Sequence, residues 1–269
     1  MFSIATDAAP GRPNEDFIVV TPEAAVVVDG AGIPFGGCEH GVVWYARQLG
    51  IGTMAALVHA PNEDLRLILR AGIEYVVGLH KDTCDLTNPG TPCAAVGILR
   101  VGEDTVDSLA LSDVSVVVDT DTGPVVTCDL AIEELSGTEP DAVRGMRFGT
   151  PEHAAAIAEL VAKQTATRNR EGGWWCAAAA SEAADHALVR TVARSDVRRV
   201  AIMSDGASRP VDQLDSDDWP SYLDRLAKVG PAEMLRYVRA IETADPHGDR
   251  HPRTKRHDDA ALAFADLSI

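Results

Sequence analysis

Short apolar runs separated by turn residues recur along the chain and predict β-strands. Turn sequences such as Pro22-Glu23, Gly102-Glu103-Asp104 and Asp121-Thr122-Gly123 divide neighbouring runs. The strands are expected over residues 1–6, 17–21, 24–28, 93–101, 105–112, 114–119, 123–128, 198–204 and 260–266.

Apolar residues recur at helical spacing in other segments, and Pro61-Asn62-Glu63-Asp64 is a typical helix start. The helices are expected over 41–59, 62–82, 151–166, 181–195, 218–228 and 231–243. Residues 31–40 and 129–150 are expected to be irregular. The order is strands, two helices, strands, helices and a last strand, which is not a regular βαβ alternation. It favours an α+β fold with two mostly antiparallel sheets flanked by helices, in a single domain over 1–269.

Acidic residues stand at the ends of several predicted strands. These acidic segments are Asn14-Glu15-Asp16, Asp29-Gly30, Ser204-Asp205-Gly206 and His257-Asp258-Asp259. A carboxylate at the end of a buried strand is partly desolvated, which costs several kcal/mol unless a cation compensates it. Carboxylates on one rim repel one another unless they share a hard cation, and oxygen ligands favour Mg²⁺ or Mn²⁺. The pattern therefore predicts a hydrolytic site with two metal ions.

The composition limits the possible partners. The formal net charge of −17 argues against nucleic acid or an anionic membrane as the main partner. No apolar run reaches the roughly 18 residues that span a bilayer. Residues 1–5 lack the basic and apolar regions of a secretory signal, so a cytoplasmic location is expected.

Two further features concern the cysteines and a basic segment. Five widely spaced cysteines without a CxxC pair favour reduced thiols and argue against a zinc site. A basic segment, Arg250 to Arg256, precedes Asp258 and is either a solvated loop or a phosphate-attracting rim. No motif indicates the oligomeric state.

Taken in order, the acidic motifs resemble those of the metal-dependent serine/threonine phosphatases of the PP2C (PPM) family, in its bacterial subgroup. The resemblance covers nearly the whole chain. The matching segments are Asn14-Glu15-Asp16 (NED), Asp29 to Gly37 (a stretched DGxGG), Cys93 to Val96 (a small-residue strand), Ser112 to Ser115 (GDS), Ser204-Asp205-Gly206 (SDG) and Asp258 to Ala261 (DNxT).

The resemblance implies a four-layer αββα sandwich with two Mn²⁺ or Mg²⁺ ions, and a third weaker ion, between the sheets. A metal-activated water would hydrolyse phosphoserine or phosphothreonine in a protein, or a small phosphorylated substrate. The implied roles are Asp29 as the bridging ligand, the Gly30 carbonyl and Glu15 as further ligands, Asp16 in the water shell, Asp205 and Asp258 on the first ion, Asp113 on the third, and Arg12 on the phosphate.

Departures from the motifs leave alternatives open. Ala31 stands where animal relatives carry a histidine, Ser112 replaces the glycine of GDS, and Ala261 replaces the threonine of DNxT. A catalytically degenerate module with a binding or regulatory role is therefore one alternative. Another is a haloacid dehalogenase-like phosphatase with Asp119 as a covalent nucleophile, which would need parallel βα units around that residue.

Overall fold

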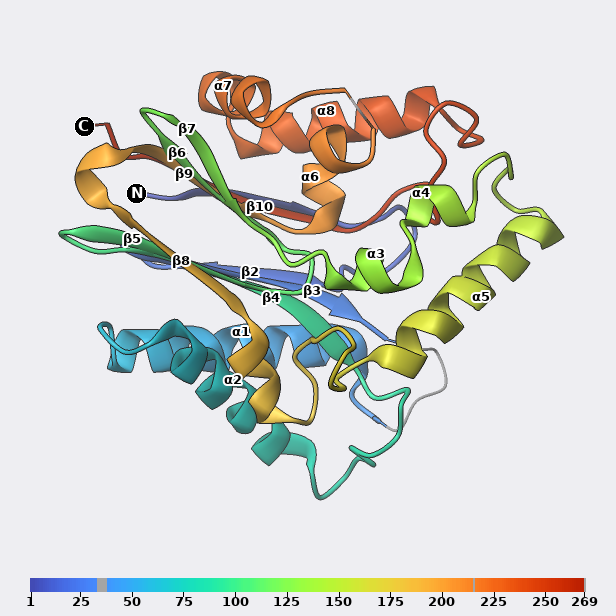
Figure 1. The fold of residues 1–269 in the computed structure, drawn as a ribbon, viewed down its shortest axis with the longest axis horizontal. Coiled ribbons are helices and arrows are strands. Elements are labelled where there is room, and N and C mark those ends of the chain that lie inside the picture. The colour runs from blue at the N-terminus through green and yellow to red at the C-terminus, as the bar shows by residue number, and fades with distance from the viewer. Residues whose placement is uncertain (33–37, 215, 269) are drawn as a thin grey trace.

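Two five-stranded sheets form the centre of the computed structural model, which describes residues 1–32, 38–214 and 216–268 (Figure 1). One sheet has the order β1-β10-β9-β6-β7 and the other β2-β3-β4-β5-β8, and every pairing between these strands is antiparallel. The strands are β1 (Ser3–Asp7), β2 (Asp16–Val20), β3 (Ala24–Ala31), β4 (Cys93–Val101), β5 (Thr105–Leu111), β6 (Ser115–Thr120), β7 (Gly123–Thr127), β8 (Leu188–Ala193), β9 (Val197–Met203) and β10 (Ala260–Asp266).

Helices cover the outer face of each sheet (Figure 1). The helices α1 (Gly41–His59) and α2 (Leu65–His80) pack on the β2-β3-β4-β5-β8 sheet. The other sheet is covered by α6 (Asp205–Asp212), α7 (Trp219–Val229) and α8 (Pro231–Ala244). The result is the four-layer αββα arrangement that the family resemblance implied, and the predicted fold class is confirmed.

The β3 strand shows why its apolar run is continuous. Val26 and Val28 pack toward α1 and α2, whereas Ala25 and Val27 pack into the interior between the sheets. Both faces of the strand are thus buried. An alternation of apolar and polar residues would bury polar groups on one face, so the run is apolar throughout. The run ends at Asp29, where the strand reaches the edge of the core.

The predicted helix over 181–195 is wrong. A 3₁₀ turn at Ser181–His186 is followed by β8, which pairs with β5 along the sheet edge. Val189 and Val192 pack on opposite faces of that sheet. Their three-residue spacing is also that of one helix face, so the pattern did not distinguish the two structures.

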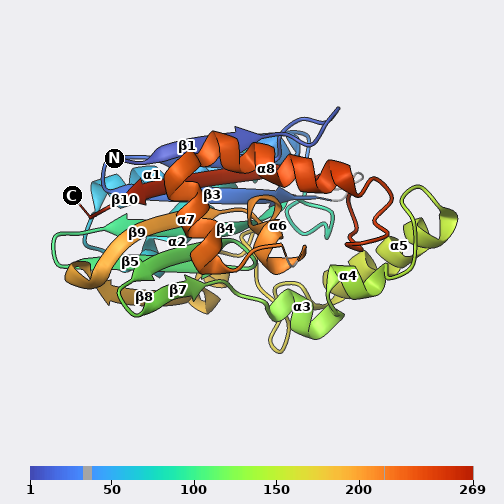
Figure 2. The same cartoon turned by 90° about the horizontal axis from the view of Figure 1, so that it is seen from above.

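A helical extension lies beyond one end of the sandwich (Figures 1 and 2). It consists of α3 (Ala131–Ser136), α4 (Glu139–Ala142) and α5 (Pro151–Thr167), of which only α5 was predicted as a helix. The side chain of Thr150 caps α5 by accepting a hydrogen bond from the His153 N–H, and Pro151 occupies its first turn. No helix in the described part of the chain is long and apolar enough to cross a membrane.

Candidate metal centre

The strand pairing brings two acidic residues together in the β2-β3 hairpin. Asp16, the first residue of β2, lies directly opposite Asp29 near the end of β3. Residues in such a register point to the same face of a sheet. Glu15 and Gly30 extend the two strands toward the same end, and a Cβ atom on Gly30 would lie 2.5 Å from the Glu15 carbonyl oxygen. Only glycine fits this close approach of the two backbones.

The second sheet presents its acidic residues at the same end of the sandwich. Met203, the last residue of β9, pairs with Ser115 at the start of β6 and with Leu262 near the start of β10. Asp205, Asp113 and Asp258 are the residues just beyond these strand ends and therefore lie at one edge.

Hydrogen bonds join the two edges. The Ser204 hydroxyl donates to Asp16 Oδ2 at 2.6 Å and accepts from the Ala261 N–H at 2.9 Å. The Asp259 carboxylate accepts from the Ala9 N–H at 2.7 Å and the Glu15 N–H at 2.8 Å. Asp259 was not among the predicted site residues, yet it holds the N-terminal segment that carries Glu15.

A cavity of about 570 Å³ opens between this edge and the helical extension. Most predicted site residues line it: Arg12, Glu15, Asp29, Gly30, Asp113 and Asp205. Asp16 and Asp258 do not line it and are largely buried, with exposures of 7% and 8%. The Gly36-Gly37 pair of the stretched motif lies outside the described residues.

Burial, and then mutual repulsion, raises the pKa values of four carboxyl groups in the acidic cluster. Burial, followed by the charges of Asp16, Asp205 and other neighbouring carboxylates, raises the pKa of Asp29 well above its usual range. Burial and the charge of Asp205 raise the pKa of Asp113 to about 7. Burial is also the main cause of the raised pKa of Asp16 and Asp205. Oxygen donors that repel one another in this way fit a hard divalent cation such as Mn²⁺ or Mg²⁺.

Asp258 differs from the other acids because two cations of the chain already bind it. Lys255 Nζ lies 2.9 Å from Oδ1, and Arg209 Nη2 lies 2.9 Å from Oδ2. Burial alone would raise the pKa of Asp258, but Lys255 and Arg209 outweigh it, and the pKa lies below its usual value. A metal ion at Asp258 would share this carboxylate with them.

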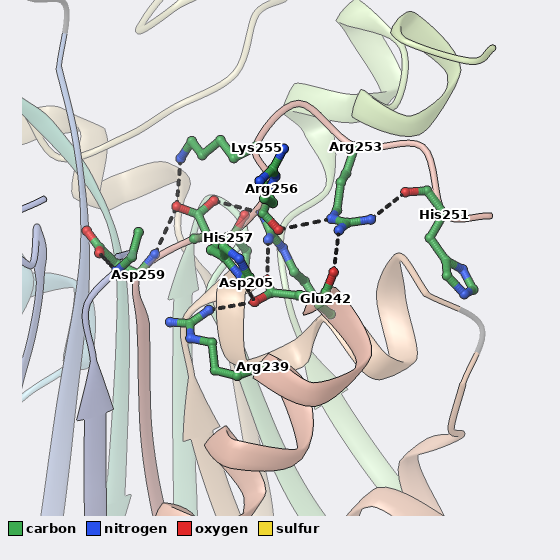
Figure 3. A network of polar contacts seen from close by, with 12 residues as sticks. Asp205, Arg239, Glu242, His251, Arg253, Lys255, Arg256, His257 and Asp259 are labelled. Atoms are coloured by element: carbon green, nitrogen blue, oxygen red, sulfur yellow. Dashed lines mark hydrogen bonds and ion pairs between the residues drawn. The ribbon is translucent and has the colours of Figure 1, made fainter. Parts of the chain in front are cut away.

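A buried ionic network extends from Asp258 through Arg209 to Glu242, and Figure 3 shows Arg239 and His257 beside Glu242. Arg209 and Glu242 are both fully buried and are joined by a 2.6 Å contact. Glu242 also contacts Arg239 and His257, at 2.8 and 2.9 Å. This network was not predicted from the sequence. The signals available were the arginine four residues after Asp205 and the i,i+3 spacing of Arg239 and Glu242.

Residues of the basic segment from Arg250 to Arg256 differ in their surroundings. Arg253 is 1% exposed and bonds to Asp245 and to the Glu242 carbonyl, so it is a structural residue (Figure 3). Lys255 instead lines the cavity. At the cavity, Lys255 is paired with Asp258 at 2.9 Å, and a phosphate-attracting rim stays a prediction.

Ser112, which replaces the glycine of the GDS motif, adopts the backbone conformation that favours glycine. Its φ of 66° lies in the left-handed region, which glycine adopts at least cost. Its hydroxyl donates to Asp113 Oδ1 at 3.2 Å. The serine therefore keeps the backbone turn before Asp113 and adds a contact to that carboxylate.

The Asp119 alternative does not fit the structure. Asp119 lies in β6 near the hairpin to β7, and its carboxylate bonds to Arg198 and Arg199. The strands around it are antiparallel. The parallel βα unit that a haloacid dehalogenase-like nucleophile needs is thus not present around this residue.

The metal-free protein should respond to pH through Asp113. Its pKa of about 7 lies above the usual 3.8, so the folded state binds more protons than the unfolded state between these values. Its contribution to the free energy of unfolding therefore falls as the pH rises through this window. In EDTA, Asp113→Asn should be more stable than the wild type at about pH 8, with a smaller gain at about pH 5. Urea titrations at both pH values would measure this, and an equal difference at both would contradict it.

Comparisons with known proteins support the architecture. No family model matches the sequence, and no curated protein matches it significantly. Solved structures do match. The catalytic domain of the serine/threonine protein phosphatase PstP in complex with two manganese ions is 17% identical, with a TM-score of 0.55 over 99% of this chain and 97% of that one.

Two further matches also extend over nearly the whole of both chains. The PPM Ser-Thr phosphatase MsPP from Mycobacterium smegmatis, in complex with cacodylate, is 14% identical, with a TM-score of 0.59 over 99% of this chain and 98% of that one. Stp1 from Staphylococcus aureus is 12% identical, with a TM-score of 0.58 over 98% and 94%. Such low identities establish the fold alone. The chain thus has the fold of the PPM serine/threonine phosphatases.

Proposed function

We propose that this chain is a metal-dependent phosphomonoester hydrolase that acts on phosphoserine and phosphothreonine in proteins. The observation that carries the proposal is the convergence of mutually repelling carboxylates from both sheets at one cavity. The manganese ions bound to PstP, a protein of the same fold, support a divalent cation here.

We assign different roles in metal binding to the acidic residues. Asp29, Asp205, Asp258, Glu15 and the Gly30 carbonyl would hold two divalent ions, and Asp113 a third. When bound, such ions lower the pKa of water and offset charge on a phosphoryl group. Asp16 is buried and held by Ser204, which suits a role behind the ligands, in their water shell.

Arg12 is the proposed phosphate contact. Its side chain is 61% exposed at the cavity and lies 3.9 Å from Glu15, so it is not committed to a close ion pair. Guanidinium groups suit phosphate because they can donate two parallel hydrogen bonds.

Arg12→Ala should therefore weaken substrate use without weakening the fold. Loss of a charge-assisted hydrogen bond of about 1.5–3 kcal/mol corresponds to a fall in kcat/KM of roughly 10- to 100-fold. Steady-state kinetics on p-nitrophenyl phosphate in Mn²⁺ would measure it, with Arg144→Ala, an exposed arginine of the helical extension, as the control. Unchanged kcat/KM in Arg12→Ala would remove Arg12 from the site.

Substrate class is tested by phosphate release in Mn²⁺ from phosphoserine, phosphothreonine and phosphotyrosine peptides and from small phosphate esters. The proposal predicts faster release from the first two peptides than from the other substrates. Preference for a small ester would retain the hydrolase chemistry but overturn the protein substrate.

A binding or regulatory module is the second candidate, and one observation favours it. Lys255 and Arg209 already neutralise the carboxylate of Asp258. They thus supply the positive charge that a metal ion would otherwise supply. A module without a catalytic metal should show no stabilisation by Mn²⁺, whereas a ligand at 100 times its Kd stabilises by about 2.7 kcal/mol. Thermal unfolding with and without Mn²⁺ separates the candidates.

A further inference from the structure

A second cluster of metal-ligating side chains lies outside the acidic centre. It consists of Cys38, His40, His80 and Cys84, which come from two pairs about 40 residues apart in the sequence. Each offers one sulfur or ring nitrogen, and these four atoms all lie within 4.8 Å of one another. The donors are soft thiols and imidazoles, unlike the oxygen donors around Asp29.

The spacing of the donor atoms matches a tetrahedral site. Cys84 Sγ lies 3.4 Å from Cys38 Sγ and 3.4 Å from His40 Nδ1. Cys38 Sγ lies 3.5 Å from His80 Nδ1 and 3.8 Å from His40 Nδ1. Zinc bonds of about 2.3 Å to sulfur and 2.0–2.1 Å to nitrogen give tetrahedron edges of roughly 3.3–3.8 Å. The side chains thus stand close to zinc geometry.

Local structure accounts for each pair. The helix α2 ends at His80, and the Cys84 N–H donates to the His80 carbonyl at 2.9 Å. This contact continues the helical path for one turn, so the side chains at i and i+4 share a face. His40 is the residue before α1, and Cys38 precedes it by two positions. The cluster therefore ties the start of α1 to the end of α2.

One aromatic side chain, Trp44, packs against both histidines of the cluster, of which His40 is exposed and His80 buried. The His40 ring stacks on Trp44 with centroids 4.2 Å apart, and Trp44 lies 5.3 Å from His80. His80 is 1% exposed, and both cysteines are partly buried. Such packing holds imidazole rings in one orientation, which favours a structural site.

We propose that Cys38, His40, His80 and Cys84 form a structural zinc site. Four protein ligands complete a tetrahedron and leave no open position, as in structural rather than catalytic zinc sites. The expectation against zinc rested on the odd number and wide spacing of the cysteines and on the missing CxxC pair, but here each ligand pair contributes one cysteine and one histidine. The site lies at the start of α1, where Val42 stands beside Gly30.

The experiment is metal analysis of the whole chain after purification with zinc present. The wild type should retain about one zinc per chain more than Cys84→Ser or Cys38→Ser. Cys128→Ser, which removes a partly buried cysteine outside the cluster, should retain as much zinc as the wild type. Thermal unfolding should show a lower Tm for the zinc-free wild type.

Cobalt substitution keeps the proposal testable if the serine variants do not fold. Co²⁺ added to zinc-free wild type should produce the intense visible bands of a tetrahedral ion and a thiolate charge-transfer band. Asp29→Asn should give the same spectrum, because Asp29 belongs to the acidic centre and not to this cluster. The zinc proposal can therefore be tested even if the chain has no phosphatase activity.

Two results would overturn the zinc site. One is wild-type protein that holds no zinc and gives no thiolate band with Co²⁺. The other is a disulfide between Cys38 and Cys84 in protein purified with zinc, detected without reductant as three free thiols in the denatured wild type and four in denatured Cys38→Ser.

Discussion

Asp29→Asn is expected to lower Mn²⁺-dependent turnover by more than about 100-fold, because changes to residues that merely support metal ligands already cost about 10- to 100-fold. Asp29 lines the cavity and lies opposite Asp16 in the hairpin. Its pKa is raised by burial and by Asp16 and Asp205, so its negative charge destabilises the metal-free protein. The variant should therefore unfold in EDTA at a temperature no lower than the wild type.

The combination of lost turnover and retained stability separates a metal ligand from a folding residue. Asp119→Asn is a matched control, since Asp119 is also a buried strand-end acid but is neutralised by Arg198 and Arg199. The control should lose stability and keep turnover in its folded fraction. Turnover of Asp29→Asn near the wild-type level would refute the assigned role.

The largest expected effect on stability comes from Glu242→Leu. Glu242 is fully buried and accepts contacts from Arg209, Arg239 and His257. Its removal leaves the buried Arg209 with Asp258 as its remaining acidic partner. Breaking a buried pair by removing one partner costs about 3–5 kcal/mol, because a buried charge is left uncompensated. Urea denaturation would measure the loss in the free energy of unfolding.

Two further variants test whether the loss of stability in Glu242→Leu comes from the uncompensated buried charge. Glu233→Leu removes an exposed ion-pair partner from the same helix and should cost no more than about 1 kcal/mol. The double variant Arg209→Met/Glu242→Leu should be less destabilised than the sum of its single variants, because it removes both charges. Equal losses from Glu233→Leu and Glu242→Leu would contradict the assigned network.

The sequence predicted the strand ends and their acids because both depend on local patterns. Apolar runs identified β3, β9 and β10, and Asp29, Asp205 and Asp258 stand at or next to their ends. Antiparallel pairing then placed these ends together. The acids at the cavity were thus predictable from periodicity and motif order.

What the sequence missed depends on contacts between distant segments. Arg209 reaches Glu242 over 33 positions, and Asp259 reaches Glu15 over 244. The helix α6 itself was not predicted, and Pro210 inside it weakens any helical signal. The thiol and imidazole cluster likewise depends on packing α1 beside α2, which no spacing motif encodes.

The most direct test of metal-dependent phosphatase activity is p-nitrophenyl phosphate hydrolysis by the wild type in EDTA, Mg²⁺ and Mn²⁺, with Asp205→Ala measured in parallel. We predict turnover that requires Mn²⁺ or Mg²⁺, is abolished by EDTA and is lost in the variant. Turnover that persists in EDTA or in folded Asp205→Ala would contradict it, as would an inactive wild type that Mn²⁺ does not stabilise.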